Sequence, residues 1–267
     1  MANNQKIILV LNCGSQSIKW KLFSLDFKAQ EEGNIRILNQ KNYKNILQAE
    51  LKKINERNIE ITTIGHRVVH AGGKFNSPLI IDKKNLKELE KISELAPLHS
   101  PYNILGIKIS QKTFPTAKQI AIFDTDFYSE LPKKASTYAL PEDIRKKYEI
   151  RRYGFHGISH DYASSEAAKI ISKPREELKI ISCHLGGGAS ITAIDRGKAV
   201  DTSMGFTPLE GLVMMTRAGN VDPGIILFLN QKSKRNKFLA SESKNQKLDY
   251  ILNNESGMKG LCGISDM

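Results

Sequence analysis

Apolar positions along the chain fall into short β-type runs separated by segments with helical spacing. Strands are predicted at Ile7–Asn12, Ile18–Leu25, Ile61–His70, Gln119–Phe123 and Lys179–His184. Helices are predicted at Tyr43–Arg57, Asn85–Leu95, Pro101–Thr113 and Ser159–Ser172, with Ser159 as the N-cap of the last. Tyr138–Tyr148, which contains Pro141, is predicted to be a connector. Strands that alternate with helices indicate an α/β fold.

Two segments have the same pattern of strand, glycine-containing turn and strand. The first is Ile7–Phe23, and the second contains the cluster Gly186-Gly187-Gly188. When the pairs Ser17-Ile18 and Ser190-Ile191 are aligned, Gly14 falls on Gly187. Loops of this kind let backbone N–H groups approach a phosphate closely. The repeat predicts a duplicated fold, with domains at residues 1–149 and 150–267.

Composition and charge narrow the class of protein. The 267 residues are 40% hydrophobic and 25% charged, which is typical of a globular protein with room for two cores. The net charge of +12 comes from dispersed lysines rather than from one arginine and aromatic stripe, so nucleic-acid binding is not supported. No apolar run approaches the ~20 residues of a membrane span. MANNQK has no h-region and leads straight into a strand pattern, so we expect no signal peptide there. Three scattered cysteines fit a reducing cytoplasm.

Charged residues stand at two strand positions where a ligand could bind. Alternation along Ile64–His70 places Arg67 and Val69 on one face, which would suit a small molecule with an anionic group and a short alkyl group. A surface ion pair is the alternative. Asp124 follows an apolar strand, at the edge where α/β sheets bind ligands, and it could hold Mg²⁺, orient a substrate or cap a turn.

The six histidines lie between His66 and His184, in contexts that favour a shared cleft. His156 and His160 have an H-x₃-H spacing, but Gly157 stands where a zinc protease needs glutamate. Cys183 and His184 are neighbours on a strand, so they point to opposite faces and cannot form a dyad. We expect Cys183 to be buried and inert.

Arginines and glycine-rich loops together indicate phosphoryl transfer. Arg217 is a second candidate for binding an anion, beside the two loops and the acid at the strand end. The chain has neither a P-loop motif nor the protein-kinase fingerprint.

Nine segments in this order resemble the acetate kinase family, of the acetate and propionate kinase superfamily. They are NCGSQSIK (12–19), GHRVVHAGG (65–73), APLHSPYNILG (96–106), FDTDF (123–127), YALP (138–141), RRYGFHGISH (151–160), CHLGGGASI (183–191), DTSMGFTPLEGL (201–212) and TRAGNVDPG (216–224). The resemblance implies a duplicated actin-like (ribonuclease H-like) ATPase fold with an incomplete second domain.

The resemblance also implies the reaction ATP + acetate ⇌ ADP + acetyl phosphate, with Mg²⁺ or Mn²⁺, in a cytoplasmic homodimer. By this resemblance Asp124, His156 and Arg217 are catalytic, and the last two stabilise the transition state. The implied substrate residues are Arg67, Val69, Leu98, Phe155 and Pro208, with Asn12 at the metal. The implied ATP residues are Lys19, His184, Leu185, Gly186, Gly187, Gly188 and Asp266.

Physical reasoning refines two of these roles. A simple carboxylic acid is ionised near neutral pH, so a general base has no proton to remove and we expect Asp124 to act through Mg²⁺ and orientation. Val69 leaves room for a short alkyl group, which favours acetate over propionate.

The sequence differs from the family pattern at three places. Gly187 replaces the usual asparagine of the phosphate loop, and Gly73 replaces a usual glutamate. Glu255–Met267 resembles the start of the adenosine-binding segment, and the sequence stops there. We therefore expect an exposed apolar sheet face and weak or no activity. The alternatives are a fragment of an acetate kinase, a non-catalytic remnant, a propionate kinase and, as a different class, a Cys/His hydrolase.

Overall fold

The structure is a computed structural model that describes residues 5–93, 100–233 and 248–264. The chain divides into two compact units, Met1–Asp126 and Phe127–Met267. Each unit is described by itself below. Among the described residues, no helix has the length and apolar character needed to cross a bilayer.

A six-stranded mixed sheet forms the first unit, in the order β3-β2-β1-β4-β6-β5. β1 runs parallel to β4 and β4 runs parallel to β6, whereas β2, β3 and β5 each pair antiparallel with a neighbour. The strands are β1 (Gln5–Cys13), β2 (Ser17–Ser24), β3 (Ala29–Arg36), β4 (Ile59–Val68), β5 (Leu79–Ile80) and β6 (Lys118–Phe123). The helices are η1 (Gln40–Asn42), α1 (Tyr43–Asn55), α2 (Lys83–Ile92) and α3 (Ser100–Thr113), and η3 (Asp126–Tyr128) follows β6.

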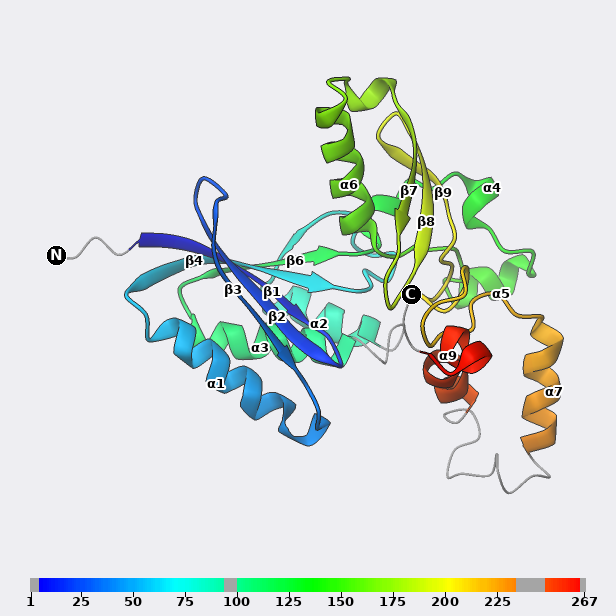
Figure 1. Cartoon of the computed structure of the whole chain (residues 1–267), viewed down its shortest axis with the longest axis horizontal. Helices are drawn as coiled ribbons and strands as arrows, with labels where there is room; N and C mark the ends of the chain where they lie inside the picture. Colours follow the sequence, from blue (N-terminus) through cyan, green and yellow to red (C-terminus); the bar gives the residue numbers. More distant parts are fainter. Residues whose placement is uncertain (1–4, 94–99, 234–247, 265–267) are drawn as a thin grey trace. The chain divides into compact units, whose positions relative to one another are not determined.

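The three α-helices of this unit lie along one face of the sheet (Figure 1). Leu47, Leu51 and Ile54 of α1 are fully buried against the inward side chains of β1 and β2. Their spacing of three and four residues is the reason that this segment forms a helix with one apolar face. The opposite face of β1 and β2 carries polar side chains, which include Asn12 and Lys19.

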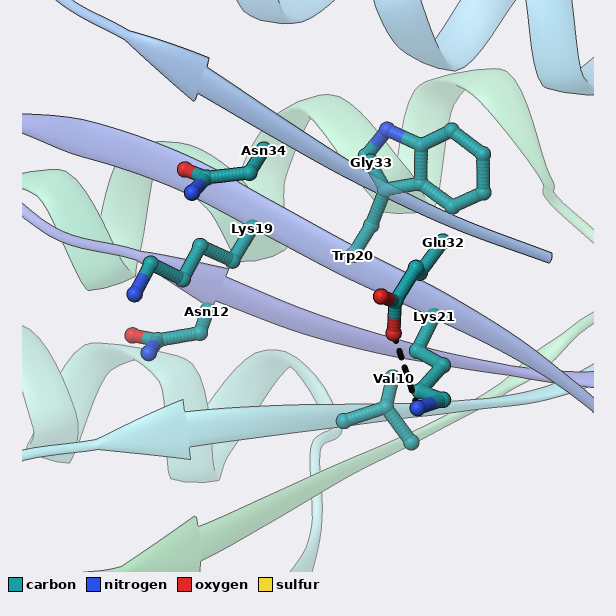
Figure 2. A pocket seen from close by; sticks show the side chains of 8 residues that line it. All are labelled: Val10, Asn12, Lys19, Trp20, Lys21, Glu32, Gly33 and Asn34. Carbon is teal, nitrogen blue, oxygen red and sulfur yellow. Dashed lines mark ion pairs between the residues drawn. The ribbon is translucent and has the colours of Figure 1, made fainter. Parts of the chain in front are cut away.

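Strand β3 was not predicted, because seven of its eight residues are polar or lack a large side chain and it shows no apolar alternation. Pairing with β2 holds it at the edge of the sheet, with Gly33 opposite Trp20. The indole of Trp20 occupies the space next to Gly33 (Figure 2), where a Cβ would clash with it. The indole N–H donates a hydrogen bond to Glu50 over 2.9 Å.

The second unit contains a three-stranded antiparallel sheet, in the order β7-β8-β9. Helix α6 packs against β7, and Figure 1 shows it lying alongside the sheet. The strands are β7 (Lys179–His184), β8 (Ser190–Asp195) and β9 (Lys198–Thr202). The helices are α4 (Lys133–Ser136), α5 (Glu142–Lys147), α6 (Gly157–Ile170), η4 (Arg175–Glu177), α7 (Pro223–Ser233), η5 (Ile251–Glu255) and α9 (Gly257–Cys262).

The two predicted hairpins are present. In the first, β1 and β2 meet across Gly14–Gln16, and in the second, β7 and β8 meet across Leu185–Ala189. A third antiparallel strand extends each pair, as β3 and β9 respectively. The compact units divide between Asp126 and Phe127, while the domain boundary at 149/150 belongs to the duplicated pattern and stays a prediction.

Three expectations about the second unit were wrong. Helix α6 begins at Gly157, and its N-cap is His156 rather than Ser159. The connector Tyr138–Tyr148 contains the short helix α5, for which Pro141 is the N-cap. Cys183 is exposed, because it shares the outward face of β7 with Ile181, which is 68% exposed.

We predict that Gly33→Ala destabilises the protein by about 1–3 kcal/mol, because the new methyl group forces the Trp20 indole out of its packed position. Gly14→Ala is the matched control, since its Cβ would meet only the Ser17 carbonyl oxygen at 3.5 Å. Thermal unfolding measures both variants, and equal melting temperatures would contradict the packing described for β3.

Candidate active site

Three polar side chains stand at the carboxyl ends of neighbouring parallel strands in the first unit. Asn12 lies near the end of β1, Arg67 near the end of β4, and Asp124 directly after β6. Parallel pairing brings these ends to one edge of the sheet, which is where α/β sheets bind ligands. The backbone N–H of Asp124 donates to Val68 O over 3.0 Å, so the pairing of β4 and β6 extends to the acid itself.

Arg67 and Asp124 form a two-point ion pair. Arg67 Nε donates to Asp124 Oδ1 over 2.9 Å, and Nη2 donates to Oδ2 over 2.6 Å. The Asp124 side chain is 2% exposed, whereas that of Arg67 is 35% exposed. A carboxylate so deeply buried needs a charged partner, and removing the partner typically costs about 3–5 kcal/mol. The guanidinium also reaches Asn12 Oδ1 through Nη1 over 3.4 Å, which links all three residues.

Two buried residues hold the backbone around this edge in place. Asn103 of α3 accepts from Val69 N over 3.1 Å and donates to Cys13 O over 2.8 Å. Thr125 Oγ1 accepts from Ala71 N over 3.2 Å. These bonds tie the segments that follow β1, β4 and β6 to one another. No sequence pattern predicts this role, since an asparagine within a helix and a threonine after an aspartate are both common.

A second acid, Asp126, was also missed by sequence reasoning. Within the described residues, both of its carboxylate oxygens are buried without a hydrogen bond. Burial raises the pKa of Asp126 to about 6; an interaction with the backbone of Phe123 opposes this rise, and the nearby Asp124 carboxylate adds to it. An unsatisfied buried carboxylate beside Asp124 is the kind of oxygen donor that a hard cation would satisfy.

A polar row crosses the outward face of the first three strands. Asn12 pairs with Lys19, and Lys19 pairs with Asn34. Figure 2 shows the three side chains projecting on the same side of the sheet, along a pocket of about 490 Å³. Beside them, Lys21 is held by Glu32 over 2.8 Å, whereas the ammonium group of Lys19 has no ion pair among the described residues. Lys19 is thus available for an anion.

In the second unit, a strained turn presents His156. Gly154 and His156 both have positive φ, +72° and +61°, and such a conformation costs about 1–2 kcal/mol in a residue with a Cβ. Tyr128 supports the turn, because its hydroxyl donates to Phe155 O over 2.9 Å and its ring lies where a Cβ on Gly154 would sit. Strain of this kind at a non-glycine residue is characteristic of functional sites.

Three histidines gather at the start of α6 and the end of β7. The rings of His156 and His184 stack with their centroids 4.1 Å apart, and the His160 ring lies 6.2 Å from that of His184. Ser159 Oγ is 2.9 Å from His184 Nδ1, which ties the first turn of α6 to β7. The H-x₃-H spacing places His156 and His160 one helical turn apart, toward the same strands.

The glycine loop between β7 and β8 opens next to these rings. A Cβ on Gly188 would lie 3.2 Å from His156 Cε1 and 3.4 Å from Arg217 Nη1, so glycine keeps free the space where the imidazole and the guanidinium meet. Arg217 Nη1 also donates to Pro208 O over 3.2 Å. None of the three loop glycines has positive φ. The close approach of this loop to a phosphate stays a prediction.

The predicted site residues therefore form two groups, one in each unit. Asn12, Lys19, Arg67 and Asp124 share the sheet edge and outward face of the first unit, and Val69 is buried beside them with 7% exposure. His156, His184, Gly188, Arg217 and Pro208 cluster in the second, with buried Phe155 in the His156 turn and exposed Leu185 in the loop. Leu98, His99 and Asp266 lie outside the described residues.

Two histidines do not join either group. His66 and His70 are buried in the first unit, with 2% and 1% exposure. His66 Nε2 lies 2.7 Å from Gln119 Oε1, across β4 and β6. The expectation of one cleft shared by the histidines was therefore wrong for these two, because the side chains that alternate with Arg67 point into the core.

The chain is similar to known proteins over almost its whole length. Residues 28–267 match the Acetokinase family. The chain is 43% identical to an acetate kinase of Halothermothrix orenii, over 97% of this chain and 70% of that relative. The structure is similar to a Porphyromonas gingivalis acetate kinase (34% identity, TM-score 0.81) and to a Francisella tularensis propionate kinase (37% identity, TM-score 0.83). Each alignment covers 98% of this chain and 71% of the solved one.

We predict that stability falls with acidification below pH 6.5 in a way that depends on His66. Burial lowers the pKa of His66 from 6.5 to about 4, so between these values the unfolded chain binds a proton that the folded chain does not. The contribution of His66 to the free energy of unfolding is constant above pH 6.5. It falls by about 2 kcal/mol between pH 6.5 and pH 5. Denaturant unfolding of wild type and His66→Gln at both pH values measures it; identical pH dependence in the two proteins would show the prediction to be wrong.

Proposed function

The chain belongs to the Acetokinase family, and on this premise we propose that its two residue groups carry out phosphoryl transfer between ATP and acetate, giving ADP and acetyl phosphate. Acetate kinases are ATP-dependent kinases with an actin-like α/β fold, and the mixed α/β architecture here is similar to that of the solved acetate kinases. The observation that carries the proposal is the ion pair of Arg67 and Asp124 beside Asn12, at the carboxyl edge of three parallel strands.

In the first unit, Arg67 is proposed to bind the carboxylate of acetate. Its Nη1 makes only a long contact of 3.4 Å with Asn12, and more than a third of the side chain is accessible. A guanidinium whose other donors are fixed by Asp124 is held rigidly, and it presents its remaining N–H groups without further loss of side-chain entropy. Acetate arrives ionised, so no residue has to remove a proton from it.

The same edge suits a magnesium ion. Mg²⁺ prefers one or two carboxylates together with waters and phosphate oxygens, and the amide oxygen of Asn12 and the carboxylate of Asp124 are such ligands. The unsatisfied oxygens of Asp126 add further negative charge. Within the described residues there is no group of three or more His, Cys, Asp and Glu that could hold a metal ion. When bound, Mg²⁺ would neutralise charge on the phosphates; Mn²⁺ is the alternative.

In the second unit, His156 and Arg217 are proposed to stabilise the transferring phosphoryl group. Both meet the space that Gly188 leaves open, and two donors fixed before the reaction stabilise developing negative charge without rearrangement. The proposed ATP residues are Lys19 on β2 and His184, Leu185 and Gly186–Gly188 of the β7–β8 hairpin, with Asp266 outside the described residues. A cytoplasmic homodimer, as the family resemblance implies, completes the proposal.

Propionate is the alternative acceptor within the same family. It is favoured by the similarity to the Francisella tularensis propionate kinase. Val69 argues for acetate, because a β-branched side chain that is buried next to Arg67 limits the length of the alkyl group beside the carboxylate.

We predict that Asp124→Asn lowers acetyl phosphate formation at saturating Mg²⁺ by roughly 10²-fold or more, since a metal-linked orienting charge is lost. The protein is expressed and purified, and its formation of acetyl phosphate from ATP and acetate is measured. Asp82→Asn is the control, because this exposed N-cap aspartate of α2 lies in the same unit and asparagine also caps helices.

The outcomes separate the proposals. Near-full activity of Asp124→Asn would show that Asp124 has no role in the active site. No acetyl phosphate from any variant would support the non-catalytic remnant, and inactivation by a thiol reagent without ATP dependence would support the hydrolase.

We predict that Val69→Ala shifts the kcat/KM ratio toward propionate by about 10-fold, the value of roughly one methylene in a hydrophobic pocket. Val68→Ala is the matched control, because Val68 is equally buried but packs into the core cluster with Ala121 and Phe123. Equal shifts in the two variants would show that Val69 does not line the acceptor pocket, and a higher kcat/KM for propionate in the wild type would make this a propionate kinase.

A further inference from the structure

A continuous line of hydrogen bonds connects the interior of the second unit to His156. Ser182 Oγ lies 2.8 Å from His160 Nδ1, His160 Nε2 lies 2.8 Å from Ser190 Oγ, and Ser190 Oγ lies 2.9 Å from His156 Nδ1. The members come from β7, α6 and β8. Ser190 and His160 are completely buried, and Ser182 is 7% exposed.

The proton count along this line permits only two arrangements. Ser190 Oγ has a single proton, so it can donate to only one of the two imidazole nitrogens and must accept from the other. His160 is neutral, because burial and the nearby His184 lower its pKa to about 4. A neutral imidazole donates from one nitrogen and accepts at the other. The direction of one bond therefore determines the direction of all three.

In the first arrangement, the donors run from Ser182 toward His156. Ser182 donates to His160 Nδ1, His160 Nε2–H donates to Ser190, and Ser190 donates to His156 Nδ1. A neutral His156 then carries its proton on Nε2, on the side of the ring that lies 3.3 Å from the Cβ position of Gly188. In the second arrangement every donor is reversed, and a neutral His156 presents a lone pair at Nε2.

We propose that Ser182, His160 and Ser190 are positioning residues that run in the first arrangement and hold neutral His156 as its Nε2–H tautomer. Ser182 favours this arrangement, because its hydroxyl is buried and its hydrogen-bond partner among the described residues is His160 Nδ1. A buried hydroxyl proton without an acceptor is costly, so Ser182 donates to His160, and the donation by Ser190 that follows requires a neutral His156.

The tautomer matters because of what the ring faces. The inference rests on the proposed function, in which His156 and Arg217 hold an anionic phosphoryl group, and Nε2–H supplies a donor there without an added proton. His160, which the family resemblance did not include among the site residues, thereby acquires a role through Ser190 rather than through contact with substrate.

The test is the ring nitrogen spectrum of the histidines in the ligand-free protein, recorded by long-range ¹H–¹⁵N NMR near pH 7.5. His156→Gln assigns the His156 signals. The proposal predicts pyridine-like Nδ1 and pyrrole-like Nε2 shifts for both His156 and His160. The reverse pattern at either ring would overturn it, whether or not the protein phosphorylates acetate, so its failure is distinct from failure of the proposed function.

Two variants test the coupling itself. Ser190→Ala is expected to bring the His156 nitrogens toward averaged shifts, and Ser182→Ala is expected to loosen the tautomer of His160 and, more weakly, that of His156. Ser159→Ala is the control, because Ser159 contacts His184 Nδ1 at 2.9 Å and lies outside the line. Unchanged His156 shifts in Ser190→Ala, or an equal change in Ser159→Ala, would contradict the proposal. The wild-type spectrum decides the tautomer even if a variant does not fold.

Discussion

The structure of the first unit depends on one electrostatic constraint: the carboxylate of Asp124 is almost completely buried at the edge of the sheet. An ionised group in that position is tolerated only because Arg67 meets both of its oxygens. The pair can form because β4 and β6 run parallel and end together, with Asp124 still bonded through its backbone to β4. Asn103 and Thr125 then fix the chain on either side, so geometry and charge support each other at this edge.

In the second unit, the surrounding contacts hold the imidazole of His156 although the backbone conformation of this residue is unfavourable. His156 has positive φ. Tyr128 holds its turn, and Ser190 of β8 and the stacked ring of His184 of β7 hold its imidazole. The same residue is the N-cap of α6, so the helix, the turn and the glycine loop all share it. Strain at His156 is therefore offset by contacts from three elements, as expected where a side chain is oriented for chemistry.

The parts of this account that followed from sequence were those with a strong local pattern. Two apolar strands around a glycine turn predict a hairpin at Gly14–Gln16 and at Leu185–Ala189, and an acid after an apolar strand predicts Asp124 at the sheet edge. Strand β3 was missed because an edge strand needs only its neighbour's backbone, and its polar residues carry no alternation. The exposure of Cys183 was not predicted, because alternation separates the two faces of a strand but does not tell which face is buried.

Contacts between residues far apart in the sequence could not be predicted either, because a local pattern does not tell which elements pack together. The H-x₃-H spacing marks one helix face, but only the fold shows that both rings reach the same serine 34 and 30 positions away. The missing hydrogen bonds of Asp126 likewise depend on what surrounds it in space. Family resemblance supplied roles for single residues, whereas the structure shows which of them support one another within each unit.

The central claim is that this chain transfers a phosphoryl group between a carboxylate and a nucleotide through a site that contains the pair Arg67 and Asp124. The most direct test follows the reverse reaction by ³¹P NMR, with acetyl phosphate, ADP and Mg²⁺, in wild type and in Arg67→Lys, which retains the charge but loses two-point binding. We expect ATP signals to replace the acetyl phosphate signal in the wild type, and to do so much more slowly in Arg67→Lys. Release of inorganic phosphate alone, or equal rates in both proteins, would contradict it.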